Sequence, residues 1–129
     1  MFGQFSAFLR HSLPFLTSHP LWTGSSRLLP LLRVVRLQTI YALGEHEVWL
    51  PWVDDLILPL RKGDTGLSGN YYVGLHEFRD MAFASHLLRK GDLFVDIGAN
   101  LGSYSLIASG VCGARSIAFE PVPCTYDRL

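Results

Sequence analysis

The sequence predicts an α/β protein whose C-terminal part contains parallel strands. An apolar run typical of a short strand, LFVDI at 93–97, leads into a glycine-rich turn, GANLG at 98–102. SYSLIAS at 103–109 suits a helix, and RSIAFE at 115–120 is a second apolar strand. Strand, helix and strand in this order form a βαβ unit, which implies a parallel pair of strands and a right-handed crossover.

The composition is typical of a folded domain and argues against nucleic acid as a partner. The chain has 129 residues, of which 49% are hydrophobic and 17% charged, so it carries enough apolar side chains for a packed core. Lys plus Arg and Asp plus Glu both number 11, and this balance argues against a nucleic-acid-binding protein. No apolar run reaches the roughly 18 residues of a transmembrane helix, so we expect no integral membrane span.

The cysteines and the N-terminal stretch bear on location. Cys112 and Cys124 lack C-x-x-C spacing, which favours reduced thiols over a disulfide framework or a zinc site. The histidines show no metal-ligand spacing, so we expect no metal. The N-terminal stretch is apolar and aromatic, but its first positive charge is Arg10, too late for the basic start of a signal peptide. We therefore expect a cytoplasmic protein.

The N-terminal region, 1–46, is expected to be a mostly helical lead-in. RLLPLLRVVRL at 27–37 predicts an amphipathic helix after Pro30, with arginines among leucines and valines. The arginines allow two interpretations: a helix with a core face and a solvated edge, or a helix on a membrane surface. The first interpretation is favoured because it is the ordinary arrangement in a globular protein.

Residues 47–74 are expected to form a β-hairpin and a loop. EVWLPWVDDLILPLR at 47–61 contains two apolar runs around a Val-Asp-Asp turn, which predicts two short strands. Pro51 and Pro59 lack the amide donor of a ladder, so these strands should lie at an edge. KGDTGLSGNYYVG at 62–74 contains four glycines and reads as a loop by composition.

The last region, 75–129, begins with a predicted helix at 75–90. Its apolar face repeats at helical spacing, and Gly91 marks its end. That face comprises Phe78, Met81, Ala82, Ser85 and Leu88.

The glycine-rich turn is suited to a ligand that contains a nucleoside. Ligands of βαβ units bind outside the carboxyl ends of the strands, and Gly98, Ala99 and Gly102 would let a ligand approach the backbone there. Glu120 ends the second strand, where an acid can accept hydrogen bonds from both hydroxyls of a ribose. Turn geometry alone would also explain the glycines, and Glu120 would also serve as the acid at a helix start.

The residues around the turn indicate which nucleoside. The dinucleotide fingerprint G-x-G-x-x-G fails, because Asn100 and Ser103 occupy its second and third glycine positions. Asp96, directly before the turn, would repel a pyrophosphate but attract the ammonium and sulfonium of S-adenosylmethionine. Asn100 would hydrogen-bond that ligand or cap the following helix. The alternative for Asp96 is a structural cap on the amides of the turn.

Two stretches of the sequence resemble a known family. GDLFVDIGANLGSY followed by SIAFEPVP resembles the first cofactor motif and second-strand acid of FkbM-type S-adenosylmethionine-dependent methyltransferases. NYYVGLHEFRDMAFASHLLRKGD is similar to the lead-in of that family, so the resemblance covers 62–129 well and 47–61 loosely. It implies the class I methyltransferase fold, a Rossmann-like α/β sandwich with a mostly parallel seven-stranded sheet and helices on both faces.

The resemblance also implies an activity. It is transfer of a methyl group from S-adenosylmethionine to a hydroxyl of a sugar, polyketide or similar metabolite, a small-molecule substrate. The implied cofactor-binding residues are Asp96, Gly98, Ala99, Asn100, Gly102, Ser103 and Tyr104 around the turn, Glu120 at the ribose, Pro121 near the adenine edge, and Glu77 from the lead-in helix.

The family's remaining strands would follow Leu129, the last residue of this chain. We therefore expect a methyltransferase sandwich truncated after its first βαβ unit, preceded by the helical segment and the β-hairpin. One edge of strand 93–97 should lack a partner, and one apolar sheet face should be uncovered. The catalytic base should lie beyond residue 129, so this chain would be an inactive or partial fragment. The alternatives are a piece of an NAD-type enzyme and a non-enzymatic interaction fragment; the oligomeric state is left open.

Overall fold

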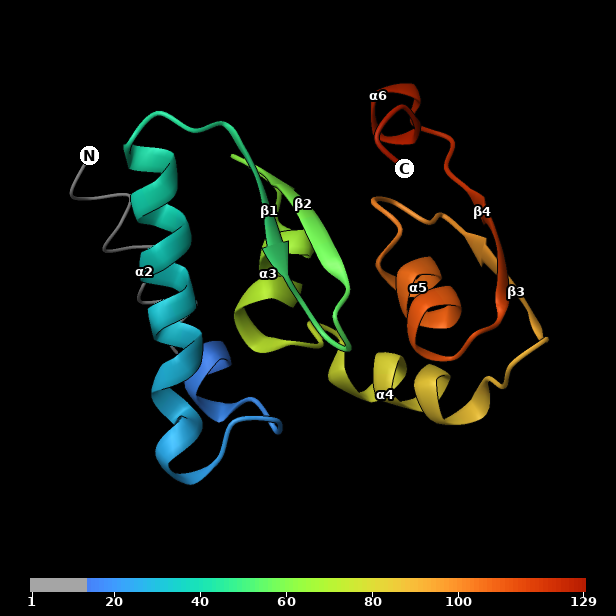
Figure 1. Ribbon diagram of the computed structural model, residues 1–129, viewed down its shortest axis with the longest axis horizontal. Helices are drawn as coiled ribbons and strands as arrows, with labels where there is room; N and C mark the ends of the chain where they lie inside the picture. Colours follow the sequence, from blue (N-terminus) through green and yellow to red (C-terminus); the bar gives the residue numbers. More distant parts are fainter. Residues whose placement is uncertain (1–13) are drawn as a thin grey trace.

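The computed structural model describes residues 14–129, so the predictions for 1–13 lie outside the described residues. Residues 14–18 are helical, and the other elements follow in a mixed α/β order (Figure 1). They are η1 (Gly24–Leu28), α2 (Leu29–Ala42), β1 (Glu47–Pro51), β2 (Ile57–Arg61), α3 (Gly66–Val73), α4 (Phe78–Leu87), β3 (Leu93–Ile97), α5 (Ser103–Leu106), η2 (Ile107–Val111), β4 (Arg115–Phe119) and α6 (Pro123–Tyr126).

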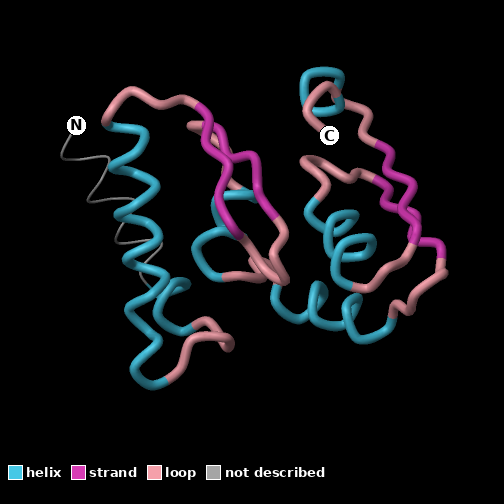
Figure 2. The backbone as a smooth tube through the Cα atoms, viewed as in Figure 1, coloured by secondary structure: helices cyan, strands magenta, loops and turns pink. Residues whose placement is uncertain are grey.

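The predicted hairpin is confirmed. β1 and β2 pair antiparallel, with Leu50 opposite Leu58, and form a two-stranded sheet of their own (Figure 2). Asp54 and Asp55 make the turn with positive φ of 48° and 62°, a conformation that aspartate tolerates better than most residues. The side chains of Leu50, Leu58 and Leu60 point to one face and are buried.

That buried face belongs to the main hydrophobic core of the described chain. α2 begins at Leu29, with Pro30 in its first turn, and continues to Ala42, five residues beyond the predicted segment. Its inner side contributes Val34, Leu37 and Tyr41, all at most 6% exposed. Figure 1 shows α2 running beside the hairpin, and α3 packs against both α2 and β2.

The loop predicted over 62–74 is wrong, because Gly66–Val73 form helix α3. Composition misled here: Gly66 and Gly69 lower helix propensity, but every residue from Leu67 to Val73 is buried. Burial of a whole helix outweighs a propensity cost of about 1 kcal/mol per glycine. Gly69 also has a packing reason, since a β-carbon there would collide with the ring of His76.

The predicted βαβ unit is confirmed at the level of its elements. β3 and β4 pair parallel, with Asp96 opposite Ala118 (Figure 2). The helix expected at 103–109 is present as α5, and its continuation η2 winds as a π-helix from Ile107 to Val111. The lead-in helix is shorter than predicted: α4 spans Phe78–Leu87, with Met81 buried against its neighbours.

One face of the parallel pair is uncovered, as expected from the sequence. Its side chains remain between 46% and 84% exposed, whereas Asp96 on the opposite face is 9% exposed beneath α5. The exposed residues are Leu93, Val95, Ile97, Ile117 and Phe119. In the part of the chain described, no helix is both long and apolar enough to cross a membrane.

Candidate functional site

The turn between β3 and α5 has a left-handed backbone at three positions. φ is +79° at Gly98, +51° at Asn100 and +75° at Gly102. Glycine adopts such angles freely, and asparagine is one of the few other residues that tolerates them. A β-carbon at Gly98 would meet no atom within 4 Å, so the space beside it is open to a ligand.

Backbone hydrogen bonds hold the turn against the end of β4. The amides of Gly98 and Ala99 both donate to the carbonyl of Phe119, at 2.8 and 2.9 Å. Ala99 is buried, and its carbonyl accepts from the amide of Gly102 at 2.8 Å. The turn therefore has one fixed shape at the carboxyl ends of two neighbouring parallel strands, the usual place of a ligand in such sheets.

Glu120 spans the turn and the start of α6. Its Oε2 accepts from the amide of Asn100 at 2.8 Å, and its Oε1 accepts from the amide of Val122 at 2.9 Å. The helix-start role considered from the sequence is therefore present, and the same carboxylate also lies against the turn. Each carboxylate oxygen has a second lone pair, so both can accept further hydrogen bonds from a ligand.

Asp96 lies on the covered face of the sheet, directly before the turn. Its Oδ2 accepts a hydrogen bond from the hydroxyl of Ser105 in α5 at 2.7 Å. The alternative considered from the sequence was that Asp96 caps the amides of the turn. The hydrogen bond described for its side chain goes to Ser105 instead. The contact with Ser105 instead orients the carboxylate between β3 and α5.

Tyr104 connects α5 to the lead-in helix. Its hydroxyl donates to Oε2 of Glu77 at 3.0 Å. Burial, this hydrogen bond and the charges of Glu77, Asp80 and Asp96 together raise the pKa of Tyr104 above its ordinary value. The phenol therefore stays protonated, and three carboxylates act on the same point of the molecule.

Ser103 contacts Asn70, a buried residue that the sequence did not indicate as part of the site. Its hydroxyl accepts from Nδ2 of Asn70, at 2.9 Å, and Asn70 is only 2% exposed. Oδ1 of Asn70 accepts from the amide of His76 at 2.8 Å. One buried amide thus joins α3 to the first turn of α5. Asn70 was not singled out because it lies in a stretch predicted as a loop. Asparagine is common in loops, so its presence there did not indicate a buried contact.

The other predicted residues lie at the rim of the turn. A β-carbon at Gly102 would stand 2.8 Å from the side chain of Leu129, so the end of the chain lies over this glycine. The side chain of Asn100 approaches Gly66 of α3. Pro121 is exposed, and no contact of its side chain assigns it to the turn.

An ion pair fixes α6 beside the turn. Arg128 donates to both carboxylate oxygens of Asp64, each at 2.8 Å, and the Asp64 side chain is 8% exposed. Burial alone would raise the pKa of Asp64, but Arg128 and the amide of Arg61 outweigh it and lower that pKa. This paired geometry is the strong form of an arginine–carboxylate contact.

Two cavities of about 400 Å³ each lie elsewhere in the described chain. The first lies between the N-terminal helical turn, α2 and α3, with Phe15, Tyr41 and Tyr72 in its wall. Glu77 and Asp80 line the second. The glycine-rich turn lines neither, so the candidate site is an open surface rather than an enclosed pocket.

The charges near the turn restrict what it can hold. Asp96, Glu77 and Asp80 gather on its α5 side, and Glu120 lies on its β4 side. A phosphate would be repelled there, whereas an ammonium or sulfonium would be attracted and hydroxyl groups would find acceptors. Comparison of the chain with protein-family models, with curated proteins and with solved structures finds no match.

Proposed function

We propose that the turn at 98–102 binds S-adenosylmethionine, and that the chain is part of an FkbM-type methyltransferase that methylates a hydroxyl of a small metabolite. The observation that carries the proposal is the placing of carboxylates on both sides of an open, left-handed turn. Asp96 lies on one side and Glu120 on the other, at the ends of two adjacent parallel strands.

The two sides match the two ends of the ligand. Asp96, Glu77 and Asp80 form an acidic side suited to the ammonium and sulfonium of the methionine part. Glu120 is held by two backbone amides, so its free lone pairs are oriented before a ribose arrives. A dinucleotide would bring its pyrophosphate against these same carboxylates, which disfavours an NAD-type enzyme.

The chemistry follows from the ligand. When bound, S-adenosylmethionine supplies a methyl group that is electrophilic because it is attached to a sulfonium. The acceptor oxygen forms a bond to that carbon, the carbon–sulfur bond breaks, and a base takes the hydroxyl proton. Tyr104 remains protonated and donates to Glu77, so it positions Glu77 rather than acting as this base. We place the reaction in the cytoplasm, with a base supplied from outside the residues described.

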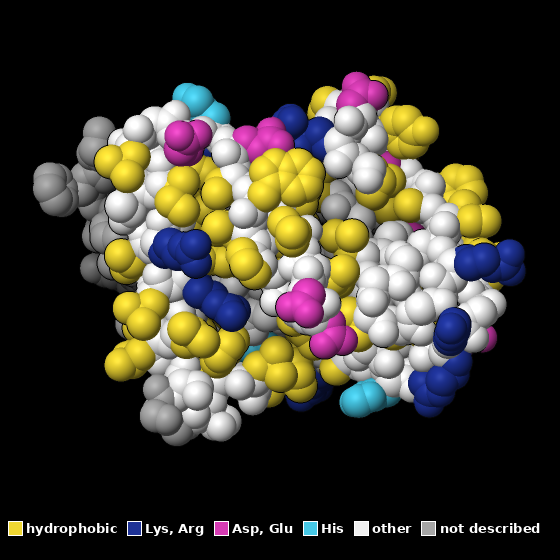
Figure 3. Space-filling view, in the orientation of Figure 1, with side chains coloured by type: hydrophobic (Ala, Val, Ile, Leu, Met, Phe, Trp, Pro, Cys, Tyr) yellow, Lys and Arg dark blue, Asp and Glu magenta, His cyan; other side chains and the backbone are white. Residues whose placement is uncertain are grey.

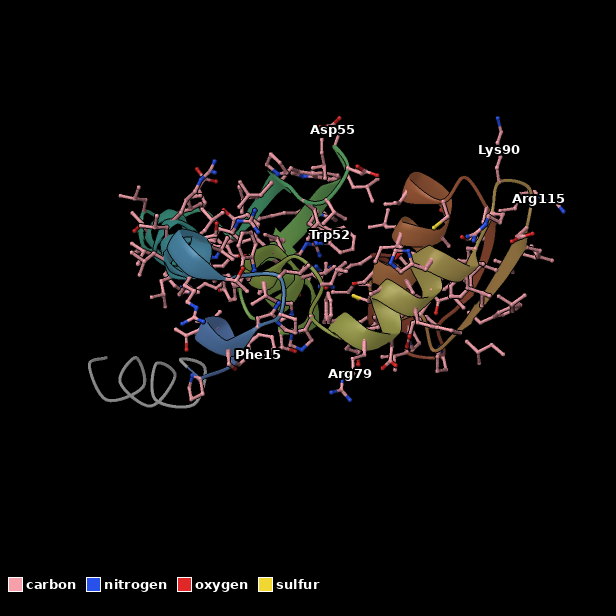
Figure 4. The ribbon with its side chains drawn as sticks, turned by 90° about the horizontal axis from the view of Figure 1, so that it is seen from below. Phe15, Trp52, Asp55, Arg79, Lys90 and Arg115 are labelled. Atoms are coloured by element: carbon pink, nitrogen blue, oxygen red, sulfur yellow. The ribbon has the colours of Figure 1, made fainter. Side chains whose placement is uncertain are left out.

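Calorimetric titration with S-adenosylmethionine tests the proposal. An open site predicts weak but saturable binding, with a Kd on the order of 100 µM or weaker. Asp96→Asn keeps the shape and the contact with Ser105 but removes the charge, and is expected to weaken binding by roughly tenfold. The matched control is Asp55→Asn at the tip of the hairpin, where Asp55 points into solvent (Figure 4).

The same titration with NAD⁺ distinguishes the two nucleotide ligands. We expect no heat of binding with NAD⁺. Tighter binding of NAD⁺ than of S-adenosylmethionine, or equal affinities of the Asp96→Asn and Asp55→Asn variants for S-adenosylmethionine, would overturn the proposal.

A further inference from the structure

We propose that the outer face of α2 docks on the surface of an anionic lipid bilayer. The α2 outer face is defined as Leu32, Val35 and Arg36 of α2 together with Arg27 and Leu28 of η1, directly before the helix. It lies opposite the side of α2 that enters the core, and it does not depend on the ligand of the glycine-rich turn.

The first observation is an apolar line on a helix surface that faces solvent. Leu28 is 65% exposed, Leu32 is 62% exposed and Val35 is 59% exposed. Their spacing of four and three residues places them along one side of the helix. The same helix already buries Val34 and Leu37 on its inner side, so this second apolar line is not needed for the core.

The second observation is positive charge without counter-charge. Arg27 and Arg36 flank the line, and the ion pairs found among the described residues involve neither of them. Residues 1–44 contain four arginines and no acid, whereas residues 45–129 contain seven basic and eleven acidic side chains. The formal charge is therefore +4 before Glu45 and −4 after it, which gives the chain a basic end.

The third observation is that the face continues onto the hairpin. A groove of about 240 Å³ lies between α2 and β1, with Leu32, Arg36 and Pro51 in its wall. Trp49 shares a strand face with Pro51 and is 65% exposed, although tryptophan prefers the boundary between water and lipid. Figure 3 shows Lys or Arg side chains over α2 with hydrophobic side chains around them.

Arg33 contributes in a different way. Its Nη1 donates to the carbonyl of Tyr71 at 3.1 Å, and its guanidinium lies 5.0 Å from the ring centre of Trp22. These contacts hold Arg33 to the fold. Of the arginines described in η1 and α2, Arg27 and Arg36 are therefore the two whose side chains face solvent.

These features together favour a lipid surface as the partner. Aliphatic side chains can enter the headgroup boundary while flanking arginines meet anionic headgroups, which is how interfacial helices bind. A nucleic acid would use the arginines but leave Leu28, Leu32 and Val35 exposed. Because residues 1–44 contain no acid, α2 itself presents no carboxylate that would repel anionic lipid.

Vesicle flotation on a density gradient tests the proposal, because floating protein is bound to lipid whereas aggregates sink. We expect the chain to float with vesicles of 70% phosphatidylcholine and 30% phosphatidylglycerol, and to float far less with phosphatidylcholine alone. Arg27→Gln with Arg36→Gln should lower the partition coefficient roughly thirtyfold, about a factor of five for each arginine.

A matched variant makes the test specific to this face. Lys90→Gln with Arg115→Gln removes the same charge at the opposite end of the molecule, where both side chains point into solvent (Figure 4). This control should float like the unchanged chain. Leu32→Ser with Val35→Ser keeps the charge and should also reduce flotation, including at raised ionic strength.

Three results would overturn the proposal. They are no flotation with anionic vesicles, equal flotation with neutral and anionic vesicles, and equal loss in the α2 variant and in the Lys90 and Arg115 control. Far-UV circular dichroism of each variant establishes that the comparison is made between folded chains. All substituted residues are exposed, and no core residue is changed.

Discussion

The two halves of the described chain differ in how completely they bury their apolar side chains. The hairpin half, residues 14–76, encloses a core in which Leu16, Leu37, Leu58 and Leu60 are wholly buried. The turn half, residues 77–129, covers one face of its two-stranded sheet and leaves the other open, with Ile97 84% exposed. The acidic turn proposed as a ligand site nevertheless belongs to the open half. Stability and candidate chemistry are thus carried by different parts of the chain.

Buried polar contacts join the two halves through α3 and the residues before it. Asn70 reaches Ser103, and Asp64 pairs with Arg128 across 64 positions of sequence. Both contacts end next to the glycine-rich turn. The turn is therefore held both by the end of β4 and, from the hairpin half, by α3.

The largest expected effect is on the free energy of unfolding when an apolar side chain is shortened to alanine, and it should differ between the two halves. Leu37→Ala removes a wholly buried side chain and should reduce the free energy of unfolding by about 3 kcal/mol. Ile97→Ala, a similar change at a side chain 84% exposed, should cost less than about 0.5 kcal/mol. Urea unfolding measures both values, and equal losses would mean that the open face is covered in solution.

A smaller effect is expected at the contact between α3 and α5. Asn70→Ala leaves the amide of His76 without its acceptor and removes the donor to Ser103, at a cost of about 2 kcal/mol. Ser103→Ala removes only one of these contacts and should cost about half as much. Hydrogen exchange at Ala99 and Gly102 should speed up in Asn70→Ala. Unchanged protection of these amides would show that α3 does not position the turn.

The smallest effect is a pH-dependent one at the ion pair. Arg128→Gln should cost about 1 to 2 kcal/mol at pH 7, because the Asp64 carboxylate is nearly buried. Arg61→Gln breaks the more exposed pair with Glu47 and should cost less than about 1 kcal/mol.

The pH dependence of this pair has a definite direction. The pKa of Asp64 is lower in the folded chain than in the unfolded chain, so its ion pair stabilises the fold above the unfolded pKa of about 4. That contribution is lost as the pH falls through the folded value. The free energies of unfolding of the unchanged chain and of Arg128→Gln, measured with urea, should therefore converge as the pH falls below the folded pKa of Asp64. A difference that persists there would assign the effect to packing rather than charge.

The sequence predicted the parts of the fold that have a local signal. The hairpin was recognisable from two apolar runs around Asp54 and Asp55, and β3, the turn and β4 from apolar runs around glycine. The uncovered face was predicted from the expected absence of the sheet's further strands. α3 was missed because its glycines mimic a loop, and only burial by α2 and β2 makes that segment helical.

The sequence predicted which residues belong to the candidate site, but it did not predict the contacts between them. The acids at 77, 96 and 120 were singled out from the motif and the resemblance. No local pattern could show that Tyr104 donates to Glu77, or that Glu120 holds the amide of Asn100. These contacts join positions 27 and 20 residues apart, so they arise only when the chain is folded.

The most direct test of the account is a ¹H–¹⁵N correlation spectrum recorded during titration with S-adenosylmethionine. We expect saturable shifts at the amides of Gly98, Ala99, Asn100 and Gly102, with little change in the hairpin half. The amide of Asn100 should respond strongly because Glu120 holds it. Shifts centred on the cavity beside Tyr41 and Tyr72, or no shifts at millimolar ligand, would contradict the claim that the open half carries the site.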